Sequence, residues 1–336
     1  MEWKHLNLKR IVKENHGCAI SQLAFPNPRH SILATVSSTQ INFYDNEHIG
    51  DHLDIISQYN GHDLRCLAWI SLPDDLLLCT ASQNVIHVFS LTRSREIKRL
   101  CGHAGLISDL ASLSQAPNWL LSTSQEDGTS RLWHLNSPET SLFTLSTFST
   151  RSVCIFISLI MKTFHLNGTS FYTATTQGVI HEWPIPMDLT TLTSADLDFF
   201  QDFALETTED SKSTDQVYHH HQAEIDALVA LSHNRLLSKS IDNTVILWQN
   251  LIPIYKIDAI YMSGRLAVSL DESLFCVGTL MGGLLFYDIE TGECVHQLKH
   301  KRSTKSIRCC AFTSKSVLCV DDDSVLWRYD VQKKEL

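Results

Sequence analysis

One stretch of sequence decides the fold: Leu236-Leu-Ser-Lys-Ser-Ile-Asp-Asn-Thr-Val-Ile-Leu-Trp248. Its two ends, 235–240 and 244–248, are short β-prone runs, and the turn-forming pair Asp242-Asn243 separates them. A weakly alternating apolar run, 227–231, comes just before and is joined to them by a turn at Asn234. Strand, turn, strand, turn and strand at this spacing predict an antiparallel meander.

An aromatic residue ends a similar β-rich run seven times along the 336-residue chain, and four of the six intervals between them measure 39 to 45 residues. The positions are Tyr44, Phe89, Trp133, Trp183, Trp248, Tyr287 and Trp327. Self-similarity at about 40–45 residues is typical of the blades of WD40 β-propellers. The sequence therefore predicts an all-β fold, a seven-bladed WD40 β-propeller that occupies residues 1–336 as a single domain.

The blades are expected to end near residues 45, 91, 135, 185, 249, 289 and 330. Segment 1–13 has no blade of its own, so it should supply the outer strand of the last blade and close the ring, which removes exposed sheet edges. Two intervals are long. One contains the apolar run 153–161, either a lengthened hairpin or a translated intron. The other contains the acidic segment 186–216, expected to be an insertion loop; its core 196–203 could instead dock on a partner or on the rim.

The bulk composition disfavours several classes of protein. The net charge is −10, which disfavours non-specific binding to nucleic acid and favours basic partners. The longest apolar run is far shorter than a membrane span, and the start Met1-Glu2-Trp3-Lys4-His5 lacks a signal-peptide core. Ten cysteines form no C-x-x-C pair, and the cluster His219-His220-His221 would point to alternate faces of a strand. We therefore expect no metal site and no cofactor.

A polar pattern accompanies the repeats. Gly102-His103 precedes one β-rich run, Asp127-Gly128 lies at its turn and Trp133 ends it, while Gly61-His62 opens the preceding unit. In WD40 repeats, such a His, a Ser or Thr, the turn Asp and the Trp form a structural hydrogen-bonded tetrad. The residues expected in this role are His62, His103, Asp127, Trp133, Asp242 and Trp248. A catalytic reading of His103, Asp127 and Ser124 is disfavoured because the pattern repeats, whereas catalysis needs one unique site. The chain is therefore predicted not to be an enzyme.

Several longer runs resemble the family of the embryonic ectoderm development and extra sex combs proteins, the WD40 subunits of Polycomb repressive complex 2. The runs are Glu14–Phe25, Ile32–Ser38, Asn118–Ser124 with Arg131–Trp133, Leu236–Trp248, Lys305–Arg308 and Val320–Asp330. This resemblance implies a nuclear scaffold subunit of a histone lysine methyltransferase that supports transcriptional repression. One face would hold a helix of the catalytic SET-domain subunit. The other face would bind a trimethylated lysine of a histone tail in an aromatic cage, through cation–π attraction.

Most of the aromatic residues of this cage have no counterpart in the chain. The resemblance matches its first two aromatic positions to Ser21 and Arg65, and the adjacent Trp-Tyr pair to Ile260-Tyr261, so one ring remains. Arg308 and Asp322 match family positions near the bound peptide. We therefore expect methyl-lysine reading to be lost or weakened.

The alternative hypothesis is a WD40 adaptor of another chromatin complex or of a ubiquitin ligase, because propellers serve many unrelated functions. Neither sequence-specific contact with nucleic acid nor insertion into a membrane is expected under either reading.

Overall fold

The computed structural model describes residues 6–13, 18–26, 31–47, 54–112, 116–136, 143–146, 150–157, 169–185, 205–206, 217–258, 262–299 and 301–331. Regular structure in these ranges is entirely β, without a helix, so the all-β prediction is confirmed. The strands within the described ranges form seven sheets. The chain divides into two compact units.

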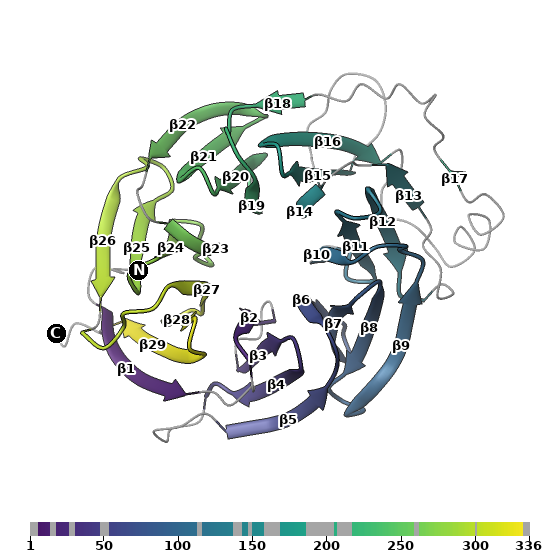
Figure 1. Cartoon of the computed structure of the whole chain (residues 1–336), viewed down its shortest axis with the longest axis horizontal. Coiled ribbons are helices and arrows are strands. Elements are labelled where there is room, and N and C mark those ends of the chain that lie inside the picture. The colour runs from purple at the N-terminus through teal and green to yellow at the C-terminus, as the bar shows by residue number, and fades with distance from the viewer. Residues whose placement is uncertain are drawn as a thin grey trace. The chain divides into compact units, whose positions relative to one another are not determined.

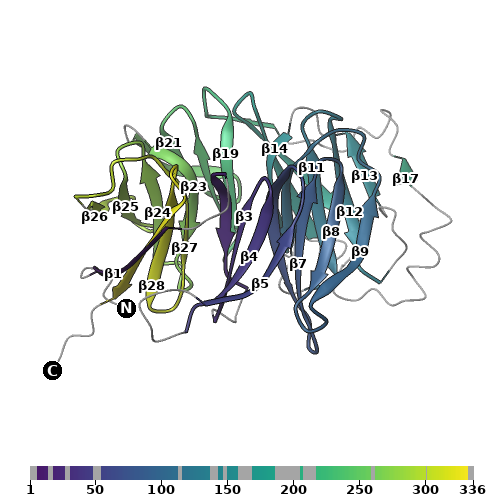
Figure 2. The ribbon, with the colours of Figure 1, turned by 60° about the horizontal axis from the view of Figure 1, so that its bottom comes forward.

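One unit comprises Met1–Leu64, Asn243–Leu247 and Pro253–Leu336. Its first sheet is β2 (Ile20–Ala24), β3 (Ile32–Ser37), β4 (Gln40–Asp45) and β5 (Asp54–Asn60), of which β3 to β5 lie side by side in Figure 2. Its second sheet is β23 (Met262–Val268), β24 (Leu274–Thr279), β25 (Gly283–Asp288) and β26 (Cys294–Lys299). Its third sheet is β27 (Ile307–Phe312), β28 (Ser316–Asp321), β29 (Val325–Val331) and β1 (Leu6–Lys13).

The other unit comprises Arg65–Asp242 and Trp248–Ile252. Its first sheet is β6 (Leu64–Ser71), β7 (Leu76–Ser82), β8 (Val85–Ser90) and β9 (Arg95–Cys101). Its second sheet is β10 (Ile107–Ser112), β11 (Trp119–Ser124), β12 (Thr129–His134), β13 (Phe143–Ser146) and β17 (Leu205–Glu206). Its third sheet is β14 (Thr150–Ile157), β15 (Thr169–Thr175), β16 (Val179–Ile185) and β18 (Val217–His219). The remaining sheet is β19 (Ile225–Leu231), β20 (Arg235–Ser240), β21 (Thr244–Gln249) and β22 (Ile252–Asp258), whose first two strands lie in this unit.

The N-terminal strand β1 pairs antiparallel with β29, from Leu6 opposite Val331 to Lys13 opposite Val325 (Figure 1). The first and last described strands of the chain therefore share one sheet. This pairing covers an edge of β29 that would otherwise expose unpaired backbone groups.

Burial differs systematically between strands of one sheet. Middle strands such as β11 and β24 are buried at every position, whereas most residues of the outer strands β9, β22 and β26 are exposed or partly buried. Strands covered on both faces read as continuous apolar runs, and strands covered on one face alternate. The apolar runs before the repeated aromatics are therefore the clearest indication of the strands in the sequence.

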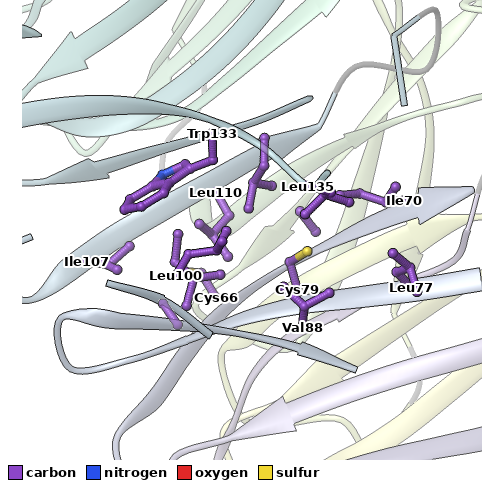
Figure 3. Packing of buried hydrophobic residues seen from close by; sticks show 14 residues of the cluster. Cys66, Ile70, Leu77, Cys79, Val88, Leu100, Ile107, Leu110, Trp133 and Leu135 are labelled. Atoms are coloured by element: carbon purple, nitrogen blue, oxygen red, sulfur yellow. The ribbon is translucent and has the colours of Figure 1, made fainter. Parts of the chain in front are cut away.

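The cores lie between neighbouring sheets. In the second unit, one cluster joins β6–β9 to β10–β12 and includes Cys79, Ile107, Leu110 and Trp133, which lie together in Figure 3. In the first unit, one cluster joins β23–β26 to the sheet of β27–β29, and another joins β2–β4 to that same sheet. Burial of apolar area at about 25 cal/mol per Å² is the main force that stabilises such layers.

The expected blade ends fall within one residue of the ends of seven strands, each the third strand of its meander: β4, β8, β12, β16, β21, β25 and β29. A fourth strand completes each of these sheets: β5, β9, β13, β18, β22 and β26 follow along the chain, and β1 completes the sheet of β29. In β4, β8, β12, β21 and β25 the aromatic is the last residue but one and its side chain is buried, while the outer strand is half exposed and lacks such a marker.

The long intervals are described only in part. Residues 153–157 of the apolar run belong to β14, and 158–161 lie outside the described residues. Within 186–216, expected to be a loop, Leu205–Glu206 instead form the short strand β17, parallel to Phe143 and Thr144 of β13. The pairing of β17 with β13 uses backbone hydrogen bonds, so the polar side chains of this segment do not reveal it. The rest of the segment lies outside the described residues.

Candidate functional site

A buried hydrogen-bonded network links four side chains of the sheet β10–β12. Ser122 is its centre: the indole Nε1 of Trp133 donates to Ser122 Oγ at 2.7 Å, and Ser122 Oγ lies 2.7 Å from His103 Nε2. His103 Nδ1 lies 2.8 Å from Asp127 Oδ2. Because the Asp127 carboxylate can only accept, the neutral ring donates its Nδ1 proton to Asp127, and Nε2 then accepts from the Ser122 hydroxyl.

The electrostatics agree with a neutral histidine. Burial lowers the pKa of His103 and outweighs the Asp127 carboxylate, which raises it. Burial alone would raise the pKa of Asp127, but hydrogen bonds from His103 and Thr129 outweigh it and hold that pKa well below its usual range. Asp127 also accepts from the backbone amides of Ala104 and Thr129, at 2.9 and 2.8 Å. The network therefore fastens the loop before β10 to the turn before β12.

This geometry contradicts the catalytic reading of His103, Asp127 and Ser124. The serine bonded to His103 is Ser122, which has no exposed surface, whereas Ser124 accepts the backbone N–H of Asp127 at 3.3 Å. A nucleophile must be reachable by its substrate, and Ser122 is sealed between strands.

The sheet β19–β21 contains a second version of the network. Trp248 Nε1 donates to Ser238 Oγ at 2.9 Å, and His221 Nε2 lies 2.7 Å from the same oxygen. Asp242 accepts the backbone N–H of Gln222 at 2.8 Å, and its Oδ2 lies 3.7 Å from His221 Nδ1. Sequence reasoning assigned Asp242 and Trp248 but missed His221. A signal was present: His221 stands four residues before Ile225, as His103 stands four before Ile107.

The other repeats depart from this pattern. His62, expected in a tetrad, is exposed, and the aromatic of its sheet is Phe89, which has no N–H to donate. In the sheet of β27–β29, Asp321 replaces the serine: its Oδ2 accepts from Trp327 Nε1 at 3.0 Å. Ser303 stands at the position of the histidine there and donates to the carbonyl of Gly282 at 2.7 Å.

A β-bulge recurs immediately after the first residue of five first strands, β2, β10, β14, β19 and β27. The residues that stand at the bulge are Ser21, Ser108, Arg151, Asp226 and Arg308. A bulge leaves one residue out of the ladder and redirects its side chain. Two of the residues matched to the peptide site, Ser21 and Arg308, therefore occupy the same structural position in different repeats.

The described bulge side chains make distinct contacts. The hydroxyls of Ser21 and Ser108 donate to the backbone carbonyls of Val36 and Thr123, at 3.0 and 3.1 Å. Ser21 lies inside β2. Asp226 binds the ammonium of Lys239 through both carboxylate oxygens, at 2.8 and 2.6 Å, and Lys239 is 1% exposed.

Arg308 and Asp322 come together within the first unit. Arg308 Nε donates to Asp322 Oδ1 at 2.6 Å, and both side chains are more than two-fifths exposed. Arg65 is exposed and belongs to the other unit, and Tyr261 lies outside the described residues. The structure thus joins one pair of the five residues matched to the peptide site.

Among the residues that the structure describes, no three His, Cys, Asp or Glu side chains gather so that they could hold a metal ion. No helical segment in that part of the chain has the length and hydrophobicity needed to cross a bilayer.

Comparison with known proteins gives two matches. Residues 94–134 match the family model of the WD domain, G-beta repeat, and this segment contains the complete His103 network. The Polycomb protein EED of Chaetomium thermophilum (strain DSM 1495 / CBS 144.50 / IMI 039719) is 30% identical over 139 residues, which are 38% of this chain and 23% of that protein. The match thus spans less than a quarter of the relative's length. Together these similarities indicate a non-catalytic protein of the all-β WD40 β-propeller class that is similar, over part of its length, to a Polycomb EED protein.

Proposed function

We propose that this protein is the WD40 scaffold subunit of a Polycomb-type histone lysine methyltransferase complex. It would bind the SET-domain catalytic subunit in the nucleus and support transcriptional repression. The observation that carries the proposal is the 30% identity to a Polycomb protein EED over 139 residues. The WD40 repeat at 94–134 supports a binding role, and its buried tetrad offers a substrate no reactive group.

The proposed architecture is one closed seven-bladed propeller. Support comes from the antiparallel pairing of β1 with β29, which places the N-terminal strand in the last sheet. A closed propeller presents two faces. We propose that one of them carries a groove for an amphipathic helix of the catalytic subunit, a recurring mode of peptide recognition.

Methyl-lysine reading is proposed to be weak or absent. Ser21 has no ring, and its hydroxyl is engaged by the Val36 carbonyl. Arg65 is an exposed cation, which would repel a trimethylammonium group. Each aromatic contact with such a cation contributes about 0.5–2 kcal/mol, so Tyr261 alone retains a small part of what a complete cage supplies.

Affinity purification of the tagged full chain from nuclear extract tests the scaffold role. A SET-domain methyltransferase should be recovered in near-stoichiometric amount, and adding the chain to that enzyme should raise its activity on nucleosomes. Recovery of a cullin adaptor in its place would overturn this proposal and support the ubiquitin-ligase reading.

Titration with histone peptides tests the reading function separately. Trimethylated and unmodified peptides should bind equally weakly, and Arg65→Tyr should strengthen binding of the trimethylated peptide selectively, because it removes a cation and adds a ring. Micromolar affinity of the unaltered chain for a trimethylated peptide, abolished by Tyr261→Ala, would contradict the proposal.

A further inference from the structure

A strongly basic loop interrupts this acidic protein. From the end of β26 to the start of β27, five of the ten residues 299–308 are Lys or Arg, although the whole chain has a net charge of −10. All five are exposed: Lys299, Lys301, Arg302, Lys305 and Arg308. Such a concentration of cations creates a local positive potential that the acidic remainder of the chain does not share.

One buried serine fastens this loop to a neighbouring turn. Ser303 is 1% exposed, and its hydroxyl donates to the carbonyl of Gly282 at 2.7 Å. Gly282 has a φ of +78°, and a Cβ there would lie 2.6 Å from the Ser303 carbonyl oxygen. The close approach holds the basic loop against the turn between β24 and β25.

That turn exposes two large apolar side chains. Leu280 is 50% exposed and Met281 is 61% exposed. Both precede Gly282 directly, so they lie beside the basic loop and within the same compact unit. Isolated exposed apolar residues are common, whereas protein interfaces combine an apolar centre with a polar rim, and this adjacent apolar pair beside charged residues has that arrangement.

Two exposed carboxylates pair with cations of this segment. Arg308 Nε lies 2.6 Å from Asp322 Oδ1, and Lys305 Nζ lies 3.9 Å from Asp323 Oδ2. These four side chains are between 41% and 57% exposed, so each pair contributes little stability and a partner's carboxylate can replace it.

We propose that the basic loop 299–308 and the turn residues Leu280 and Met281 form a docking surface for an acidic peptide segment of a partner protein, with a large apolar side chain among its carboxylates. Lys301 and Arg302 attract the carboxylates, and Leu280 and Met281 cover the apolar side chain; methionine adapts to varied shapes. The exposed apolar pair favours a peptide over nucleic acid.

Fluorescence anisotropy with the full chain tests this surface. The probe is a fluorescein-labelled decapeptide, Asp-Glu-Leu-Asp-Asp-Phe-Glu-Glu-Leu-Asp, and a peptide with lysine at every acidic position is the charge control. The acidic peptide should bind at least tenfold tighter than the lysine peptide, and its affinity should fall as salt is raised.

Two surface variants separate the two parts of the surface. Lys301→Glu with Arg302→Glu should weaken binding at least tenfold, and Leu280→Ser with Met281→Ser should weaken it severalfold without changing the salt dependence. The matched control is Lys315→Glu, an exposed charge reversal in the turn between β27 and β28, which should leave affinity unchanged. Circular dichroism spectra of all variants should superimpose.

Three outcomes overturn the proposal. They are equal loss of affinity in the Lys315→Glu control, no loss in the Lys301 and Arg302 variant, and tighter binding of a 20-base-pair DNA duplex than of the acidic peptide. The proposal does not depend on the methyltransferase function, because the assay contains no catalytic subunit or histone. Failure here would leave that function standing, and the reverse also holds.

Discussion

Replacement of Ser122 by alanine should destabilise the protein far more than its size suggests. Ser122 Oγ accepts from Trp133 Nε1 and contacts His103 Nε2, each at 2.7 Å. Trp133 is 1% exposed and His103 is 3% exposed, so water cannot replace the lost partner. Two buried polar atoms would thus lose their hydrogen bond in one substitution.

The expected cost follows from those two atoms. A buried donor or acceptor left unsatisfied costs about 1–3 kcal/mol, so Ser122→Ala should lower the free energy of unfolding by about 3 kcal/mol. The matched control is Ser108→Ala in the same sheet, whose hydroxyl donates to the backbone carbonyl of Thr123 at 3.1 Å. That change removes one hydrogen bond in a partly exposed site and should cost about 1 kcal/mol or less.

Urea denaturation followed by tryptophan fluorescence measures both variants. With a slope of about 1–3 kcal/mol per molar urea, Ser122→Ala should lower the midpoint by about 1 M or more. Combining it with Trp133→Phe completes a double-mutant cycle, which should give a coupling energy of about 1 kcal/mol or more. Equal midpoints for Ser122→Ala and Ser108→Ala, or additive costs in the cycle, would refute the reasoning.

Three further predictions follow from single contacts. Because burial lowers the pKa of His103, its ring should remain neutral at pH 6.5, and nitrogen NMR of the ring can show this. Below about pH 6.5 the histidine of the unfolded chain takes up a proton, whereas the buried ring of the folded chain does not. This histidine should therefore lower the free energy of unfolding as the pH falls below about 6.5. Lys239→Met should lower the free energy of unfolding by about 2 kcal/mol, and adding Asp226→Asn should recover part of it in urea titrations, since the buried pair is bidentate; no recovery would argue against the ion pair. Gly264→Ala should unfold the protein at a clearly lower temperature in calorimetry, because its φ is +65° and a Cβ would collide with the Arg308 carbonyl; an unchanged melting temperature would contradict that geometry.

The repeated tetrad shows how far local patterns reach. Trp133, Asp127 and His103 were predictable because each stands next to a turn or at the end of a strand. The serine of the tetrad was not identified from the sequence, because Ser122 and Ser124 differ only in the strand register. In β11 Ser122 lies opposite Arg131 and Ser124 opposite Thr129, a pairing that the sequence of β11 alone does not encode.

The residues matched to the peptide site show that contacts are harder to predict from the sequence than residue types. Their chemical types could be read in the sequence, and so could the absence of aromatic side chains at Ser21 and Arg65. Their contacts could not. The Arg308–Asp322 pair and the engaged hydroxyl of Ser21 depend on a bulge whose position follows from strand pairing, not from residue type.

The sequence by itself determined that the chain is built from repeated β-meanders, because turn residues and apolar runs act over a few neighbouring positions. Only the tertiary structure decided which distant groups meet: the His103 ring with Ser122 across 19 residues, the Ile20 backbone N–H with the Ser324 hydroxyl across 304, and the basic loop with the Leu280 turn through Ser303. Contacts of this kind are fixed by the register and packing of whole sheets, so they depend on many residues at once and leave no local pattern.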